Sequence, residues 1–420
     1  MPGKVSNWPA WSEFLTPPQT VSEDTFTLSA TAKAEVIAQY GQDALRQGWL
    51  RVCKDLEAVT ERLARLGSDA IPVLKLTDIS REGLSDEQHS ILKSSGCCVI
   101  RGVLGEEEAT GLYQDLKAFL TDNQGAIPGV NPNPPQSHPG PEGPQLSLPR
   151  QVGRDITRAL SYTDAARIRP PGQSFLGLGP HIDAGSLCRW ADPQYRQVYG
   201  QILSGHPELH DPYDLDVRKN ADQFLFKAQA HSVVFRSFQG WTALTQTSAT
   251  KGTLLLYPEV KSTVAYLMLR PFFAPPPNQE DVMDAEKWTF DPDSNWFPGT
   301  IREQSQRLSP SSHPHLRLKE CLSYIPDMKP GDTVWWHTDM CHAVDPDQLG
   351  DQDASVVYVA SCPTTPINKR YIKEQLEAAL AGRSPPDCTG VETNESKLKG
   401  YTGFSQVSEE GKAVLGFGLI

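Results

Sequence analysis

A histidine and a carboxylate lie two residues apart in the segment GPHID, where His181 and Asp183 follow a Gly-Pro pair. Side chains two residues apart on a β-strand point to the same face of the sheet. An imidazole and a carboxylate on one face suit ferrous iron held by two histidines and one carboxylate, with coordination positions left open. A plain structural interpretation, a hydrogen-bonded pair on a strand, also fits, because His-x-Asp occurs by chance in many chains.

Such a metal site needs a second histidine from a distant strand, and the segment GDTVWWHTDMCHAV offers His337 and His342. His342 follows a short turn and leads into a strand, whereas His337 ends the preceding strand beside Trp336. We therefore predict His342 as the third ligand and His337 as a residue that supports the ligands or lines the pocket. His313 and His315 lie in a polar stretch and are expected to be solvated.

The elements that must position these residues begin with helices. Residues 30–66 are rich in Ala, Leu, Glu and Arg, and their apolar residues recur at intervals of three and four, which predicts a helix. Ser85 can cap a second helix that stops at Gly96. The strand CCVIRGVL and a further helix, EEEATGLYQDLKAFL, complete a support layer.

From about residue 165 onward, short apolar segments alternate with Gly, Pro and Asp turns, as in GTLLLYPEV, TVAYLMLRPFF and SVVYVASCP. This pattern is typical of an all-β sandwich or barrel. We therefore expect a mainly β protein with peripheral helices. Residues 1–74 would form a helical extension and 75–420 one domain, with its β core at about 165–365.

Two long excursions, at about 190–228 and 272–320, interrupt the expected β core. Long insertions in a compact domain usually carry function. In the second excursion, polar runs alternate with Trp288, Phe290, Trp296 and Phe297. They could fold over a substrate as a closing lid, or they could pin a surface excursion to the protein.

Taken in order, His-x-Asp, FRSFQGWTALT, YLMLRPFF and GDTVWWHTDMCHAVDP resemble motifs of the ferrous iron/2-oxoglutarate-dependent oxygenases. From about residue 75 to the C-terminus, the chain is most similar to a largely uncharacterised fungal and bacterial family related to phytanoyl-CoA hydroxylase. The resemblance implies a double-stranded β-helix, or cupin-like jelly roll, with Fe(II) on His181, Asp183 and His342. It also implies 2-oxoglutarate as cosubstrate, which reacts with O2 and releases succinate and CO2 while a small molecule is oxidised.

One segment departs from this resemblance. The related enzymes usually hold the distal carboxylate of 2-oxoglutarate with Arg-x-Ser on the last strand, but here Asp353 stands in the arginine position while Ser355 can fill the serine position. A buried carboxylate needs a cation, so we predict Arg236 as the anchor and Trp241 as an aromatic neighbour of the cosubstrate. Ion pairing and core packing are the structural alternatives. Three more arginines are held in reserve: Arg167, Arg169 and Arg270.

The residues around the predicted ligands suggest a substrate pocket that combines a cation with aromatic walls. Arg189 and Trp190 follow His-x-Asp, and Trp335 and Trp336 precede the second histidine. Such a pocket would fit a small carboxylate-bearing molecule such as an amino acid, although each residue could equally serve packing at the rim.

Composition narrows the classes of partner. A net charge of −12 without a run of Lys and Arg argues against nucleic acid or an anionic membrane surface as partner. No apolar stretch reaches the length of a membrane span, and the eight scattered cysteines predict reduced, mostly buried thiols. We therefore expect a soluble cytoplasmic protein. Its oligomeric state is left open.

Three functions fit these observations. The first is an Fe(II)/2-oxoglutarate-dependent dioxygenase acting on a small molecule. The second is a cupin-like module that binds an organic acid without oxygenase activity, which the missing Arg-x-Ser favours and the His, Asp, His set disfavours. The third is a metal-dependent enzyme that does not use 2-oxoglutarate. Consumption of 2-oxoglutarate by the iron-loaded protein separates them.

Overall fold

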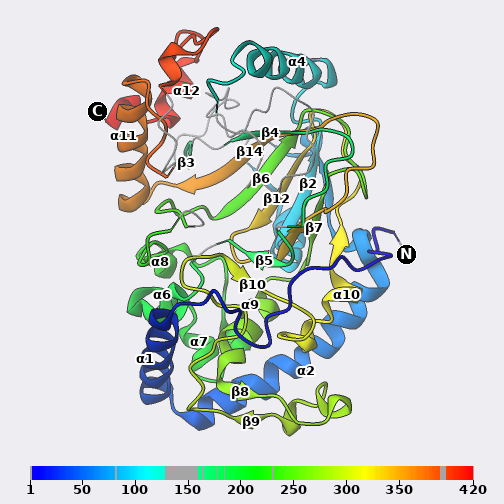
Figure 1. The fold of residues 1–420 in the computed structure, drawn as a ribbon, viewed down its shortest axis with the longest axis vertical. Coiled ribbons are helices and arrows are strands. Elements are labelled where there is room, and N and C mark those ends of the chain that lie inside the picture. Colours follow the sequence, from blue (N-terminus) through cyan, green and yellow to red (C-terminus); the bar gives the residue numbers. More distant parts are fainter. Residues whose placement is uncertain are drawn as a thin grey trace.

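The computed structural model describes residues 2–80, 83–127, 159–162, 165–176, 178–183, 185–228, 231–387 and 394–419. Figure 1 shows strands in the middle of the molecule, with α1 and α2 on one side of them and α4, α11 and α12 on the other. The helices are α1 (Glu23–Tyr40), α2 (Gln42–Leu66), α3 (Asp86–Ser95), α4 (Glu106–Asp122), α5 (Cys188–Ala191), α6 (Pro193–Val198), α7 (Gly200–Leu203), α8 (Leu215–Arg218), α9 (Lys261–Leu269), α10 (Leu318–Cys321), α11 (Pro366–Leu380) and α12 (Glu409–Val414).

The first and larger sheet has the strand order β1-β2-β12-β6-β14-β3, and β4 also pairs with β14. It is mixed, because β1 and β2 run parallel while the other pairs are antiparallel. Its strands are β1 (Val73–Lys75), β2 (Cys97–Arg101), β3 (Ala159–Leu160), β4 (Ala166–Arg169), β6 (Phe238–Ala243), β12 (Thr333–His337) and β14 (Ala354–Pro363).

The second sheet is antiparallel and has the order β10-β5-β13-β7-β11. Its strands are β5 (His181–Ile182), β7 (Leu254–Leu256), β10 (Gln306–Arg307), β11 (Ser323–Tyr324) and β13 (His342–Val344). A separate hairpin pairs β8 (Phe273–Ala274) with β9 (Thr289–Phe290).

The predicted fold class, a mainly β double-stranded β-helix or cupin-like jelly roll, is wrong. The described residues are 40% helical and 15% strand, and the two sheets do not close into a barrel. The segment TVAYLMLRPFF misled the prediction, since most of it forms helix α9 rather than a strand. Residues 263–269 of α9 are all buried, and a helix buried on every side has no apolar periodicity that distinguishes it from a buried strand.

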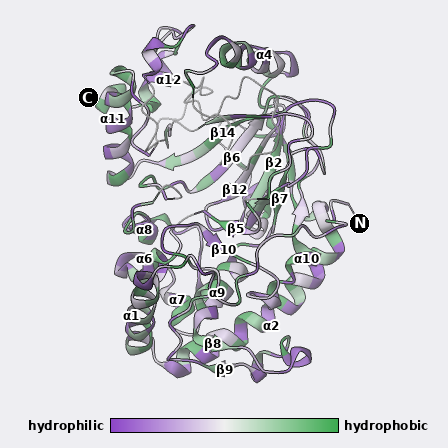
Figure 2. Cartoon of the chain, viewed as in Figure 1, coloured by the Kyte–Doolittle hydropathy of each residue, from purple (hydrophilic) through white to green (hydrophobic). Residues whose placement is uncertain are grey.

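The N-terminal helices confirm one pattern and refine another. The predicted helix over 30–66 is broken at Gly41, whose φ of 81° separates α1 from α2. Ser85 caps α3 in a capping box with Gln88, and Gly96 ends that helix in the left-handed region, as the sequence predicts. Figure 2 shows hydrophobic and hydrophilic stretches alternating along α2, which fits a helix with one buried face.

The buried face of α2 joins the N-terminal helices and the second excursion in one hydrophobic cluster. Trp49 stacks on Phe273 and Tyr266 at centroid distances of 4.7 and 5.3 Å and contacts Trp288 at 5.2 Å. Its indole N–H donates to the Ala285 carbonyl at 3.1 Å. The hairpin β8–β9 is therefore held against the core by α2.

Aromatic side chains of the second excursion pack into the protein interior. Trp288 and Phe297 are 1% and 0% exposed, and Trp296 is buried beside the N-terminal segment, where its indole donates to the Leu15 carbonyl. His313 and His315, expected in solvent, are buried as well. This arrangement fits the alternative in which the aromatic residues pin a surface excursion to the protein, rather than the one in which they form a closing lid over a substrate.

Candidate metal centre

Two strands of the second sheet bring the predicted histidines together. His342 on β13 is the direct partner of His181 on β5, and the two rings lie 4.2 Å apart between centroids. Side chains directly opposite each other on antiparallel strands share one face of the sheet. Strand pairing therefore joins residues that are far apart in the chain.

Asp183 completes the cluster from the end of β5. Its Oδ1 lies 3.2 Å from Nε2 of His181, and its Oδ2 lies 3.4 Å from Nε2 of His342. Ligand atoms of these three residues all fall within 4.8 Å of one another. The histidines are buried, whereas the Asp183 side chain is 31% exposed. Two imidazoles and a carboxylate thus converge with one side still open.

The backbone fixes which ring nitrogens face the cluster. His181 donates from Nδ1 to the Gly179 carbonyl at 2.8 Å, and His342 donates from Nδ1 to the Met340 carbonyl at 3.0 Å. A carbonyl can only accept, so Nδ1 carries the proton in both rings. Nε2 of each ring then faces Asp183, and this is the nitrogen through which a metal ion would be bound.

Charge in the cluster favours a cation. Burial lowers the pKa of His181, and the nearby His342 lowers it further, so the His181 ring remains neutral. Burial alone would raise the pKa of Asp183, but His342 and His181 hold it well below its usual range. The cluster therefore presents two imidazoles and one carboxylate, a donor set suited to a divalent transition metal.

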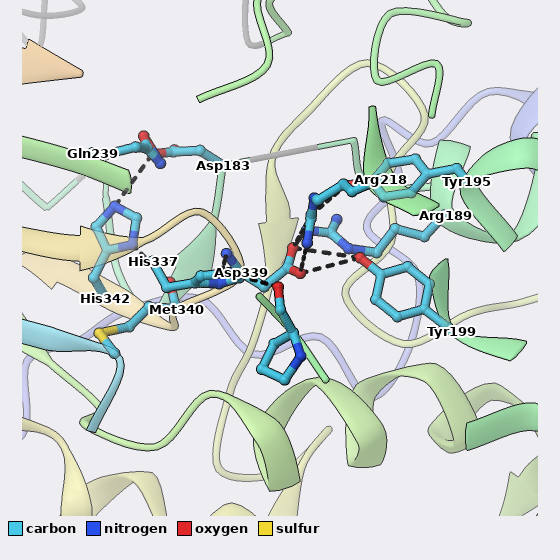
Figure 3. A network of polar contacts seen from close by, with 11 residues as sticks. Asp183, Arg189, Tyr195, Tyr199, Arg218, Gln239, His337, Asp339, Met340 and His342 are labelled. Carbon is cyan, nitrogen blue, oxygen red and sulfur yellow. Dashed lines mark hydrogen bonds and ion pairs between the residues drawn. The ribbon is translucent and has the colours of Figure 1, made fainter. Parts of the chain in front are cut away.

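Gln239 reaches the cluster from the larger sheet. It lies on β6, and its side-chain amide donates to Oδ2 of Asp183 at 3.1 Å. Figure 3 shows the Gln239 and Asp183 side chains next to each other, with His342 below them. A hydrogen bond of this kind fixes the orientation of a ligating carboxylate. No sequence pattern marks Gln239, because its position opposite Asp183 depends on how the two sheets face each other.

His337 is not part of the cluster. Its Nε2 donates to the Pro212 carbonyl at 3.0 Å, and its Nδ1 accepts the Asp339 backbone N–H at 3.1 Å. Both ring nitrogens are thus engaged, and burial lowers the pKa of His337 to about 4. The structure brings His342, and not His337, together with His181 and Asp183.

A buried ion-pair network lies next to the metal cluster, on the turn between His337 and His342 (Figure 3). Asp339 accepts from Arg218 at 2.7 Å and from Arg189 at 3.0 Å, and the Tyr199 hydroxyl lies 3.3 Å away. Asp339 and Arg189 are fully buried. Asp339 and Arg218 were not among the predicted residues, because neither carries a sequence motif of its own.

The predicted substrate residues have different surroundings. Arg189 donates to Asp339 in the buried ion-pair network. Trp190 is fully buried, and its indole N–H donates to the Met268 carbonyl at 3.1 Å. Trp336 does lie beside the cluster, with its ring 5.2 Å from that of His342. The structure thus brings Trp336 to the candidate site and takes Arg189 and Trp190 into the core behind it.

The residues predicted to bind the cosubstrate, Arg236, Trp241 and Ser355, do not lie together in the structure. Trp241 lies two residues after Gln239 on β6 and therefore on the same face, in a hydrophobic cluster that includes Trp336. Arg236 lies over the Tyr162 ring at 5.5 Å. Ser355 alternates with Val356, which packs with Trp241, so Ser355 points to the opposite face of the sheet.

All three reserve arginines donate to carbonyl groups, and Arg167 does so to the Gly252 carbonyl at 3.3 Å. Arg169 donates to the Gln173, Asp345 and Pro346 carbonyls, and Arg270 donates to the Ser312 and Phe273 carbonyls. Arg167 is the register partner of Val356 and shares its face, toward Trp241. Asp353, in the position where arginine was expected, forms an ion pair with Lys117 at 2.9 Å.

Comparison with known proteins places this geometry in a family. Residues 26–139 and 150–417 match the Gig2-like family. The chain is a member of the Gig2-like family. YbiU of Escherichia coli (strain K12), an uncharacterised protein, is 29% identical in an alignment of 381 residues that covers 83% of this chain and 86% of YbiU.

Solved structures show the same fold. GIG2 (DUF1479) of Candida albicans, the product of GlcNAc Inducible Gene 2, superposes with a TM-score of 0.79 at 25% identity, covering 96% of this chain and 90% of that one. A Salmonella typhimurium LT2 protein, provisionally called an oxidoreductase, gives a TM-score of 0.76 at 24% identity, covering 96% and 99%. Membership of the Gig2-like family is thus shown, while the link to phytanoyl-CoA hydroxylase stays a resemblance. Within the described residues, no helix combines the length and apolarity needed to cross a membrane.

Proposed function

We propose that this Gig2-like protein is a non-haem Fe(II)/2-oxoglutarate-dependent oxygenase that oxidises a small molecule, such as an amino acid or another small carboxylate. The observation that carries the proposal is the convergence of His181, Asp183 and His342, with both Nε2 atoms turned toward the carboxylate. The Salmonella relative provisionally called an oxidoreductase is consistent with this class, although its identity supports only a shared fold.

The three residues fit an iron ion. Two imidazole nitrogens and one carboxylate oxygen are the donors of a facial triad, which leaves positions open for cosubstrate and dioxygen. When bound, iron would supply the oxidation of the substrate by O2, coupled to the conversion of 2-oxoglutarate to succinate and CO2. The protein's own part is to orient the ligands and to keep the surroundings dry.

Particular residues perform that part. Gln239 fixes one Asp183 oxygen, and the Gly179 and Met340 carbonyls fix both rings. Trp336 forms an apolar wall against His342. For the cosubstrate anchor, Arg236 was the first choice from the sequence, and Arg167 faces the interior of the protein on the Trp241 side. Comparing 2-oxoglutarate affinity in Arg236→Leu and Arg167→Leu decides between them.

The proposed function is tested with purified protein loaded anaerobically with Fe(II). We expect one metal ion per chain, binding of 2-oxoglutarate, and succinate formation after oxygen is admitted, all three lost in Asp183→Ala. Metal binding without 2-oxoglutarate binding would assign a metal-dependent enzyme of another kind. Binding of organic acids without metal would assign a binding module, and either result would overturn the proposal.

A further inference from the structure

The second excursion contributes a cation next to the candidate metal ligands. β10, which lies in the excursion 272–320, pairs with β5 so that Arg307 is the direct partner of His181. Since His181 is also the partner of His342, the three residues form a row across β10, β5 and β13. Direct partners on antiparallel strands place their side chains on one face.

The neighbouring residue supports this orientation. Gln306 precedes Arg307 on β10 and therefore points to the other face. Its side chain is fully buried and accepts the Thr300 hydroxyl at 3.0 Å. With Gln306 committed to the interior behind the sheet, the Arg307 guanidinium belongs to the face that carries the imidazoles.

The backbone at Arg307 is held on both sides. Arg307 donates its N–H to the Gly299 carbonyl at 2.8 Å, and Leu308 donates to the Pro180 carbonyl at 2.9 Å. Gly299 has a φ of +75°, and a Cβ there would come within 1.9 Å of the Arg307 carbonyl oxygen. Only glycine fits this close approach, so the turn fixes the strand that presents Arg307.

The charge of the metal face calls for an anion. Burial lowers the pKa of Arg307 and the nearby Asp183 carboxylate raises it, which places Arg307 within electrostatic reach of the cluster. A divalent metal and the Arg307 guanidinium would both bring positive charge to this partly exposed face. Arginine is also the side chain that best matches a carboxylate through two parallel hydrogen bonds.

We infer that Arg307 binds a carboxylate group of the molecule that occupies the metal face, an inference that rests on the proposed function. Arg307 thereby supplies a cation at the metal face, where Arg189 was expected and is paired with Asp339 instead. The carboxylate belongs either to the substrate or to the cosubstrate, and both sources offer the same chemistry to the guanidinium.

The test uses full-length protein loaded with Co(II), which avoids turnover. Arg307→Leu and Arg307→Lys are compared with Arg302→Leu, a matched control on the same excursion whose guanidinium pairs with Asp24 and Glu303. Calorimetry measures the binding of Co(II), 2-oxoglutarate, pyruvate, glutarate and glutaramide. Pyruvate lacks the distal carboxylate of 2-oxoglutarate, and glutaramide lacks both charges of glutarate.

We expect Arg307→Leu to keep Co(II) affinity and to weaken at least one carboxylate probe by about tenfold or more, with partial recovery in Arg307→Lys. Loss confined to 2-oxoglutarate, with pyruvate unchanged, assigns the carboxylate to the cosubstrate. Loss for glutarate, with 2-oxoglutarate and glutaramide unchanged, assigns it to the substrate.

Three results would overturn the inference: equal carboxylate affinity in Arg307→Leu and Arg302→Leu, a loss of Co(II) in Arg307→Leu, or a Co(II)-loaded wild type that binds no carboxylate probe. If the wild-type protein binds no Co(II), the proposed function is contradicted instead. In that case, Arg307-dependent carboxylate binding to the metal-free protein would still support the inference.

Discussion

Arg218 and Asp339 form a two-point ion pair inside the protein, in which Nη2 of Arg218 lies 2.7 Å from Oδ1 and Nη1 donates to Oδ2. Asp339 sits on the turn that leads to His342, and Met340 of the same turn accepts the His342 Nδ1 proton. The ion pair therefore fixes the stretch of backbone that orients a candidate metal ligand.

Asp339→Asn should destabilise the fold strongly. It removes the charge that compensates Arg218 and Arg189 in a buried site, and breaking a buried pair typically costs about 3–5 kcal/mol. Chemical denaturation at pH 7 measures the loss. Glu377→Gln, which removes an exposed partner of Lys373, serves as control and should leave the midpoint unchanged. Equal midpoints for Asp339→Asn and wild type would contradict a structural role for the network.

The Asp339 contribution has a defined pH dependence. Arg218 and Arg189 hold the pKa of Asp339 far below its usual range, although burial opposes this. A depressed folded pKa adds stability above the unfolded value of about 4, and this stability is lost as the pH falls below it. The stability difference between wild type and Asp339→Asn should be constant from pH 5 to 7 and shrink in acid. A difference that grows on acidification would refute the assignment.

Buried neutral histidines should make the protein sensitive to mild acid. Burial lowers the pKa of His210, His315 and His337 to about 4 in each case. Because unfolded histidine titrates near 6.5, the unfolded state binds more protons between about pH 6.5 and 4, and stability falls over that range. Denaturant midpoints at pH 7 and 5 measure the fall. His315→Gln should flatten the pH dependence, and an unaltered slope would count against this origin.

Gln239→Leu should weaken the metal site without unfolding the protein. The substitution removes the donor to Asp183 Oδ2, and losses of such supporting partners typically lower metal affinity about 10–100-fold. Co(II) titration of Gln239→Leu, Gln239→Glu and wild type measures the effect. His337→Gln is the comparison: it should lower stability, because the ring bonds Pro212, yet retain the metal. Metal loss in His337→Gln with full retention in His342→Ala would reverse the ligand assignment.

Trp49→Ala should loosen the second excursion. The indole contacts Phe273, Tyr266 and Trp288, and such a deletion typically costs about 3–5 kcal/mol. Limited proteolysis should then cut within 272–320 faster than in wild type. Cleavage at the wild-type rate would show that α2 does not hold the excursion in place.

The candidate site was largely readable from the sequence where chemistry and spacing are local. His181 and Asp183 share a strand face by period, and His342 follows a recognisable turn. The substrate residues were not readable in the same way. Arg189 follows the motif in sequence, but Gly185, with a φ of 65°, turns the chain into α5 and carries Arg189 into the core. Arg307 reaches the ligands through strand pairing with a distant segment, which no local pattern reveals.

The fold was harder to predict than the site. The β14 segment SVVYVASCP is a strand as expected, whereas the α9 segment has the same apolar composition and forms a helix. The two segments differ in their tertiary surroundings. Helix α9 packs against α2 and α7 and can be apolar on every side, so its hydrophobic residues show no helical periodicity. In such segments, an apolar composition indicates that the residues are buried but does not distinguish a helix from a strand.

Because β5 and β13 meet in a single register, the candidate donors tolerate changes in chain length between them. Both excursions lie between His181 and His342, and the cost of closing a longer loop grows only slowly with its length. The exposed turn at Met283, on the β8–β9 connection, is 53% exposed and far along the chain from either donor. Gig2-like proteins can therefore gain or lose residues at such a turn during evolution, and a peptide tag can be inserted there, while the donor atoms keep their positions.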